Sequence, residues 1–175
     1  MTGSRITIPV RLDAKTFKRF SRFDMFALRR RWVRPAVFAL VLAAFAAVAL
    51  LSGKSQAGLI AAVLLAVGLG LPLTYFGTFL SQVNAQAERL GLDNARPVYT
   101  VTLDFDGVKV VNNMKREDVQ AVKWPEVQAA FLRKGCIYLY VSPAKAFLLP
   151  DGQADATDGE VWAYLKDHMG DKCKG

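Results

Sequence analysis

The sequence predicts an α+β membrane protein, in which a two-helix transmembrane hairpin carries a cytoplasmic antiparallel β-barrel-like domain that a C-terminal helix caps. Three observations predict this fold class. Two apolar runs stand close together, arginine gathers before the first of them, and short alternating segments with turn signals fill the chain after residue 97. The predicted parts are an N-terminal arm (1–34), the hairpin (35–80), a helix extension with a linker (81–96) and the β-rich domain (97–170).

The arm begins with a predicted strand and continues as a helix. Residues 5–12 alternate between apolar and polar, and Pro9, which has no N–H to donate, favours an edge position in a sheet. Asp13 is a suitable N-cap for a helix that reaches Leu28. At about 100° per residue, aromatic side chains share one half of this helix and basic side chains much of the other. The two sets are Phe17, Phe20, Phe23 and Phe26, and Lys15, Lys18, Arg19, Arg22 and Arg29.

Two placements of this helix are open, and they are compatible. In one, the helix lies in the membrane interface with its basic side toward the headgroups; in the other, its phenylalanines pack on the β-rich domain. Trp32 suits the aromatic belt of a bilayer interface. The pattern indicates general attraction to anionic lipid and does not define a specific lipid site. The candidate membrane-interface residues are Lys18, Arg19, Arg22, Arg29, Arg30, Arg31, Trp32 and Arg34.

The two apolar runs, Pro35–Leu51 and Leu59–Phe79, contain no charged side chain. A helix that crosses a bilayer core about 30 Å thick needs about 20 residues, with a lower limit of about 17, and both runs meet that limit. Too little chain remains to enclose both helices in a soluble domain. The loop at residues 52–56 is so short that the helices must be antiparallel neighbours.

Charge predicts the orientation of the hairpin. Residues 1–34 hold ten Lys/Arg against two Asp/Glu, residues 81–175 hold twelve against thirteen, and Lys54 is the single charge between them. The positive-inside rule therefore places both termini on the cytoplasmic side of the cell membrane. The basic arm adjoins an apolar run, so its expected partner is anionic lipid and not nucleic acid.

Gly68, Gly70 and Pro72 lie together in the second run. They predict a kink or a close helix contact, because proline lacks the N–H for a helical bond and small residues let helices approach. A hinge or an ion-binding backbone patch is the functional alternative. The runs hold no ionisable residue, which disfavours ion-coupled transport.

After residue 90, with Gly91 as the C-terminal cap of the extended helix, the pattern becomes that of strands. Five to seven strands are expected to form one curled antiparallel sheet, within residues 98–105, 108–111, 119–124, 126–132, 136–141 and 146–149. Asp106-Gly107 marks the first hairpin turn. A capping box at Thr157 and Glu160 opens a final helix, whose apolar face is Val161, Trp162, Leu165 and Met169.

This order of segments resembles the YcxB-like membrane proteins. The residues that carry the resemblance are Phe105-Asp-Gly-Val108, Val122-Lys-Trp-Pro-Glu-Val127, Leu149-Pro150 and, in the arm, Ile8-Pro-Val-Arg-Leu12. The resemblance implies a C-terminal domain similar to a pleckstrin-homology (PH) barrel. It implies no reaction and no site residue.

Groups for catalysis are scarce in this sequence. His168 is the only histidine and stands on the last helix, where a solvated or helix-terminal residue is expected and not a general base. Asp104 is expected to be an ordinary turn residue. Residues 115–118 are expected to be a solvated charged loop, and the acidic run 151–160 a loop that ends in a helix cap and not a calcium site. Cys136 is expected to be buried in a strand and Cys173 to lie in the tail, so neither a disulfide scaffold nor a zinc site is predicted. Trp124 is expected in the core, with a surface anchor as its alternative. The sequence therefore predicts no catalytic residue, cofactor or metal.

These observations favour a non-enzymatic interaction module at the cytoplasmic face of the membrane, whose domain binds a protein partner. The alternative is a small oligomeric transport or channel subunit that the cytoplasmic domain regulates.

Overall fold

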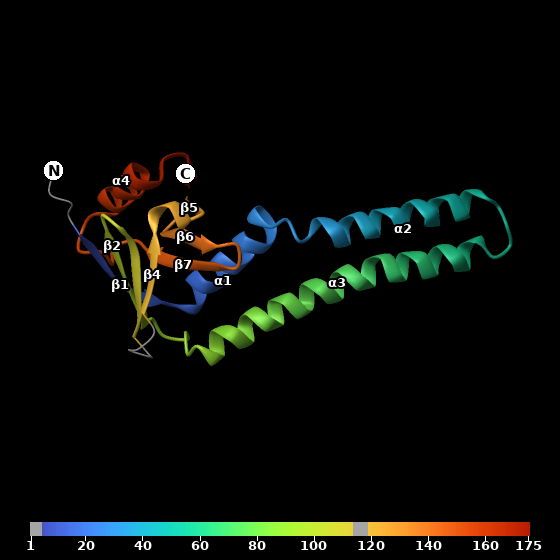
Figure 1. The fold of residues 1–175 in the computed structure, drawn as a ribbon. Coiled ribbons are helices and arrows are strands. Elements are labelled where there is room, and N and C mark those ends of the chain that lie inside the picture. The colour runs from blue at the N-terminus through green and yellow to red at the C-terminus, as the bar shows by residue number, and fades with distance from the viewer. Residues whose placement is uncertain (1–4, 114–118) are drawn as a thin grey trace. The chain divides into compact units, whose positions relative to one another are not determined.

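The computed structural model describes residues 5–113 and 119–175, so the predicted charged loop at residues 115–118 lies outside the described residues. The chain is α+β and forms two compact units. One unit joins the described residues up to Phe20 with those from Gly91 onward, and the other is Ser21–Leu90 (Figure 1).

The second unit is a helical hairpin. Helix α2 (Val33–Leu51) and helix α3 (Ala57–Arg89) are joined by residues 52–56, as the sequence predicts. At 1.5 Å per residue, α2 is about 28 Å long and α3 about 50 Å. Helix α3 continues through Pro72 and ends where Gly91 adopts a positive φ of 63°. Gly91 therefore provides the predicted end of the helix, in a conformation that costs glycine little.

Small residues form the contact between α2 and α3. Ala46, Ala57, Ala61 and Gly68 are buried in the hairpin. A Cβ added at Gly68 would lie 3.1 Å from the Cβ of Leu42 and 3.6 Å from the carbonyl oxygen of Ala39. The structure thus confirms the prediction that small residues let the two helices pack closely.

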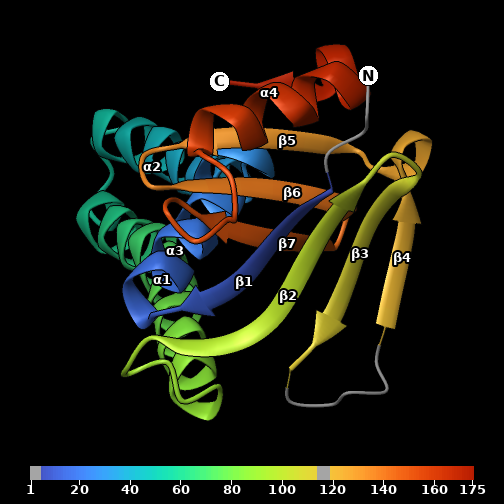
Figure 2. The ribbon, with the colours of Figure 1, turned by 90° about the vertical axis from the view of Figure 1, so that its left-hand side faces the viewer.

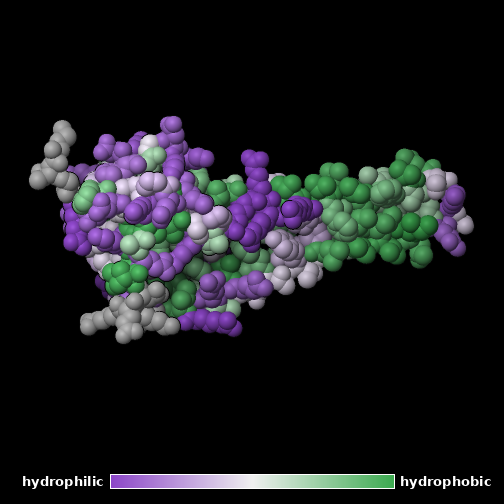
Figure 3. Space-filling model, viewed as in Figure 1, coloured by the Kyte–Doolittle hydropathy of each residue, from purple (hydrophilic) through white to green (hydrophobic). Residues whose placement is uncertain are grey.

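The outward faces of the hairpin are apolar. Both helices are long and apolar enough, by length and composition, to cross a membrane, and only 6% and 11% of the residues in their most apolar stretches are buried. Leu40, Leu51 and Leu59 are 70%, 87% and 71% exposed. Figure 3 shows hydrophobic side chains covering the hairpin over most of its length. A core helix of a soluble protein would have buried such residues.

In the first unit, four strands form an antiparallel sheet in the order β1-β2-β3-β4. Strand β1 lies at one edge of this sheet, where the missing N–H of Pro9 leaves no ladder bond unmade, as predicted. The β2–β3 hairpin pairs Asp104 with Gly107 around a two-residue turn. The strands are β1 (Ile6–Leu12), β2 (Arg96–Asp104), β3 (Gly107–Asn112) and β4 (Val119–Lys123).

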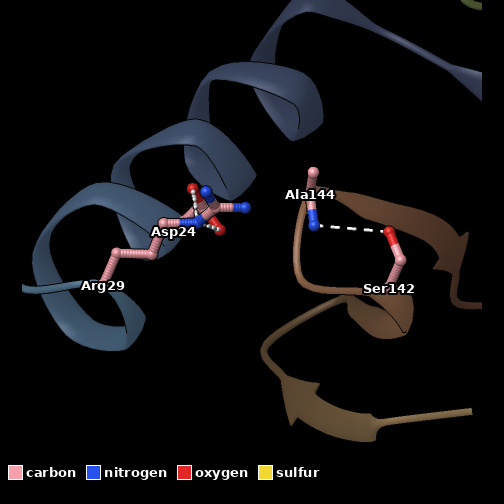
Figure 4. Close-up of polar contacts among 4 residues, drawn as sticks. All are labelled: Asp24, Arg29, Ser142 and Ala144. Carbon is pink, nitrogen blue, oxygen red and sulfur yellow. Dashed lines mark hydrogen bonds and ion pairs between the residues drawn. The ribbon is translucent and has the colours of Figure 1, made fainter.

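A second four-stranded sheet has the order β7-β6-β5-β8. Its strands are β5 (Ala129–Arg133), β6 (Cys136–Ser142), β7 (Lys145–Pro150) and β8 (Cys173–Lys174), and β8 pairs with β5 in parallel. The hydroxyl of Ser142 accepts a bond from the Ala144 N–H in the turn after β6 (Figure 4). The sequence predicts one curled antiparallel sheet, whereas the described strands form two sheets, neither of which closes into a barrel. Strand β8 was missed because two residues are too few to show an alternating pattern.

The acidic loop after β7 covers the outer edge of β1. The Thr7 N–H donates to Asp155 Oδ1 at 2.8 Å, and the Asp155 N–H donates to the Thr7 carbonyl at 3.1 Å. Arg11 lies two residues after Pro9 on the same strand, and Gln153 bonds both of its backbone groups. The Arg11 N–H donates to Gln153 Oε1 at 2.6 Å, and Gln153 Nε2 donates to the Arg11 carbonyl at 3.0 Å. The loop therefore does for β1 what a neighbouring strand would do, and it protects an edge that would otherwise be open.

Helix α4 (Asp158–Met169) closes the first unit beside β5 (Figure 2). The capping box at Thr157 and Glu160 is present as predicted. Val161, Leu165 and Met169 are buried, whereas Trp162 is only half-buried. Trp124 is 7% exposed and its indole donates to the Asp104 carbonyl at 2.9 Å, which confirms its predicted place in the core.

Candidate functional site

Four arginines gather where the hairpin begins. Helix α1 (Ala14–Phe23) runs into the π-helix η1 (Asp24–Leu28), and a short turn then leads into α2. Three of the arginines lie in this turn and the fourth in the first turn of α2. A cavity of about 510 Å³, which we call the arginine cavity, is lined by Arg29, Arg30, Arg31, Arg34, Pro35 and Tyr75.

Backbone bonds hold the turn that carries these arginines. The N–H of Arg29 donates to the Asp24 carbonyl at 3.0 Å, and the N–H of Arg31 donates to the Met25 carbonyl at 3.1 Å. Arg30 adopts a φ of 46°, which is uncommon for a residue with a side chain and costs about 1–2 kcal/mol. The turn thus stores backbone strain at the place where charge is concentrated, a pattern that is typical of binding sites.

The positive charge of the cavity is only partly compensated. The guanidinium of Arg29 forms an ion pair with Asp24 at 3.0 Å (Figure 4). Arg30, Arg31 and Arg34 are exposed, and none of them has a carboxylate partner within the part of the chain that the structure describes. The N-terminus of α2 adds the positive end of a helix dipole. The positive charge at this place therefore favours an anion.

The antiparallel pairing of the helices brings Tyr75, the aromatic residue of the cavity, close to the arginines. Leu42 and Gly68 lie at the same level of the hairpin. Seven residues before Leu42 is Pro35 and seven residues after Gly68 is Tyr75, so these two share a level near the arginines. Next to Tyr75 in the chain, Phe76 stacks its ring on that of Phe26, with the ring centroids 5.9 Å apart. Tyr75 was missed as a site residue, although counting outward from the loop at residues 52–56 would have placed it opposite Arg34.

The other predicted interface residues lie outside this cavity. Trp32 donates its indole N–H to the Phe26 carbonyl at 3.1 Å and remains exposed. Arg19 donates to the Lys134 carbonyl at 2.9 Å, in the turn between β5 and β6. Lys18 and Arg22 stand one turn apart on α1, half-buried and exposed respectively. The structure therefore brings four of the eight predicted residues together in the cavity.

One ring of the aromatic stripe packs on the β-rich domain. Phe20 meets Tyr138 edge-on at 5.2 Å and Tyr140 at 6.1 Å, both on β6. At the start of the same helix, the Asp13 carboxylate accepts a bond from the Thr16 N–H at 2.9 Å. A bond from the Thr16 side chain, together with this backbone bond, lowers the pKa of Asp13. Through Phe20, α1 thus packs on the domain, as one of the two open placements expects.

The remaining polar groups have structural partners. His168 lies against Trp124 at 4.9 Å and Tyr164 at 4.3 Å, and its Nδ1 is 2.9 Å from the Tyr164 carbonyl. Cys136 is buried in β6 as predicted, and Cys173 lies in β8 and not in an unstructured tail. Over residues 5–113 and 119–175, no three His, Cys, Asp or Glu side chains come close enough together to hold a metal ion.

No family model, no curated protein and no solved structure matches this chain. The resemblance to YcxB-like proteins therefore stays a prediction.

Proposed function

We propose that this protein is a membrane-anchored, non-enzymatic interaction module. The hairpin crosses the cytoplasmic membrane with both termini inside, and it holds a YcxB-like, PH-like domain at the inner leaflet, where the domain binds a protein partner. The observation that carries the proposal is the hairpin itself. Its exposed apolar surface is about as long as a bilayer core is thick, and it has four arginines at one end against Lys54 at the other.

The depth of the charged groups supports this anchor. Tyr75 is 18 residues after Ala57, which corresponds to about 27 Å along α3. The connecting loop and the arginine cavity are thus separated by about one bilayer core. The last turns of α3 then extend beyond that core and hold the polar residues Ser81, Gln82, Asn84, Gln86, Glu88 and Arg89.

Reporter fusions test the topology. A fusion at Gly175 is expected to report a cytoplasmic location and an insertion at Lys54 an external one, and the protein is expected to stay in membranes at alkaline pH. A hairpin in which Arg29, Arg30, Arg31 and Arg34 become Gln and two lysines are added beside Lys54 serves as the matched control, because it should invert. Release at alkaline pH without detergent would contradict the anchor.

Proximity labelling from the C-terminus tests the partner. Among the large apolar side chains that the structure describes in the β-rich domain, Phe105 at the tip of the β2–β3 hairpin is the most exposed, at 68%, and is therefore the most available to another protein. Phe105→Asp is expected to remove a labelled partner without loss of the fold, since the side chain is exposed. The control is the labelling enzyme tethered to the membrane without this protein. If the control labels the same set of proteins, the idea of a specific partner is contradicted.

A small oligomeric transport or channel subunit is the second candidate. One observation favours it: Gly70 and Gly77 have no atom within 4 Å of a Cβ added to them, so the outer face of α3 can accept a close neighbour. Cysteine crosslinking at position 77 in native membranes distinguishes the two. A ladder of oligomers supports the second candidate, and monomers alone exclude a pore lined by several hairpins.

A further inference from the structure

The arginine cavity has the chemistry of a site for phosphate oxygens. Its size lies within the range of small-ligand sites, which is about 300–1,000 Å³. Guanidinium groups bind phosphates with two parallel hydrogen bonds, and three of them here have no carboxylate partner among the described residues. Like charges held together repel one another, so an anion that enters the cavity relieves that repulsion as well as gaining new bonds.

The site is also pre-organised. The Arg29–Asp24 pair, the two backbone bonds of the turn and the positive φ of Arg30 fix the backbone before any ligand arrives. Trp32 ties the start of α2 to η1 through the Phe26 carbonyl. A ligand therefore loses no binding energy to ordering this backbone and orders only the arginine side chains.

We propose that the arginine cavity binds the headgroup of one acidic phospholipid that carries two negative charges, of the cardiolipin or phosphatidic acid class. Arg30, Arg31 and Arg34 donate to its phosphate oxygens, and Tyr75, which lines the same cavity, offers a hydroxyl donor. The three uncompensated charges exceed the single charge of one phosphodiester, which is the reason for a doubly charged headgroup. The inference rests on the proposed membrane anchor, which brings the cavity to the level of the lipid phosphates.

Native mass spectrometry of the full chain, released from nanodiscs of phosphatidylcholine with added cardiolipin or phosphatidylglycerol, tests the proposal. One retained cardiolipin per chain is expected, in preference to phosphatidylglycerol and phosphatidylcholine. The triple variant Arg30→Gln, Arg31→Gln, Arg34→Gln is expected to weaken retention at least tenfold, because each charge-assisted bond alone is worth about that factor. Tyr75→Phe, which keeps the ring, is expected to weaken it about two- to tenfold.

The matched control removes the same charge from elsewhere on the arm. The triple variant Lys15→Gln, Lys18→Gln, Arg22→Gln is expected to leave cardiolipin retention unchanged. Equal losses of retention in the two triple variants would show that the arm attracts anionic lipid only through its total charge, and they would overturn the proposal. A triple Arg→Lys variant at 30, 31 and 34 keeps the charge and is expected to bind with intermediate strength. Displacement of the lipid by millimolar inorganic phosphate would assign the cavity to free phosphate and overturn the lipid assignment.

The proposed anchor and this site fail in different ways. If the chain leaves membranes without detergent, the anchor is wrong. The lipid site alone is wrong under a different outcome. In that outcome the variant with Gln at positions 30, 31 and 34 stays in membranes, unfolds at the same temperature as the native chain and retains cardiolipin equally well.

Discussion

The Tyr99 hydroxyl joins the two sheets by bonding both backbone groups of Leu148. It accepts a bond from the Leu148 N–H at 2.8 Å and donates to the Leu148 carbonyl at 3.1 Å. Tyr99 lies on β2 and Leu148 on β7, and the Tyr99 ring meets Phe147 edge-on at 5.4 Å. Burial raises the pKa of Tyr99 well above its ordinary value, so the hydroxyl remains a donor. A single side chain thus supplies bonds that β7 would otherwise need from another strand.

Tyr99→Phe is expected to destabilise the β-rich domain by about 1–3 kcal/mol, because the mutation leaves two backbone groups of Leu148 without partners. Thermal unfolding of the full chain in detergent measures the change. Tyr164→Phe is the control, since the Tyr164 hydroxyl makes no hydrogen bond within the described part of the chain. Equal effects of the two mutations would contradict the role of the Tyr99 hydroxyl.

Asp155→Ala is expected to open the edge of β1. The mutation removes the acceptor of the Thr7 N–H, and the loss of one such bond costs about 1 kcal/mol. Hydrogen exchange at Thr7 should become faster, while that at Val101 in the centre of the sheet should change little. Asp155→Asn keeps an acceptor oxygen and should restore protection of Thr7; if it exchanges as fast as Asp155→Ala, the loop does not protect β1 in this way.

Thr157→Ala removes one half of the capping box of α4 and is expected to cost about 0.5–2 kcal/mol of stability, with Thr157→Ser close to the native protein. The bonds from Thr157 lower the pKa of Glu160 below its ordinary 4.5. The reciprocal bond therefore contributes stability above pH 4.5 and loses it as the pH falls through the lower pKa of the folded state. A stability profile between pH 3 and 6 should be flatter for Glu160→Gln, whose amide does not titrate; an unchanged profile would contradict the coupling.

Gly68→Leu is expected to weaken the hairpin by about 1–3 kcal/mol, because its side chain must enter the space that Leu42 occupies. Gly70→Leu, two residues away on the same helix, is the matched control, since no atom lies within 4 Å of its Cβ position. Unfolding in increasing SDS, followed by circular dichroism, measures both. Equal midpoints would show that α2 and α3 do not pack through Gly68.

The two cysteines are expected to differ in reactivity. Burial, with a smaller effect of the Asp151 charge, raises the pKa of the Cys136 thiol to about 12, whereas Cys173 is partly exposed. At pH 8 a maleimide should label one thiol per native chain, none in Cys173→Ser, and one in Cys173→Ser after unfolding. Between pH 9 and 12 the Cys136 thiol ionises in the unfolded chain and stays protonated in the folded chain. This thiol should therefore lower the stability of the folded state as the pH rises through that window. Rapid labelling of native Cys173→Ser would contradict the burial.

Much of the secondary structure could be predicted because its signals are local. The apolar runs determine α2 and α3, Gly91 ends α3, and Thr157 begins α4, since helix periodicity and capping depend on residues a few positions apart. The same is true of the two-residue β2–β3 turn, which Asp106-Gly107 marks in the sequence. These features need no distant partner.

The arginine cavity was predictable only in part. The excess of arginine before the first apolar run marks the end of a span, so Arg29, Arg30, Arg31 and Arg34 could be named from the sequence. Their arrangement around one cavity depends on the π-helical turn and on the φ of Arg30, which no local pattern encodes. Arg19, which was named on the same grounds of charge, lies on α1 and donates instead to the Lys134 carbonyl, 115 positions along the chain.

The sequence by itself determined the two apolar helices, the uneven charge and the capped C-terminal helix, because each follows from composition and short-range spacing. Only the tertiary structure decided that the strands divide into two sheets, that Tyr99 joins them and that the acidic loop covers β1. These outcomes depend on bonds between residues 49 to 148 positions apart, and strand alternation carries no information about which distant partner satisfies an edge. The same physical reason places Tyr75 beside the arginines: it comes from another helix, and only the pairing of α2 with α3 brings it there.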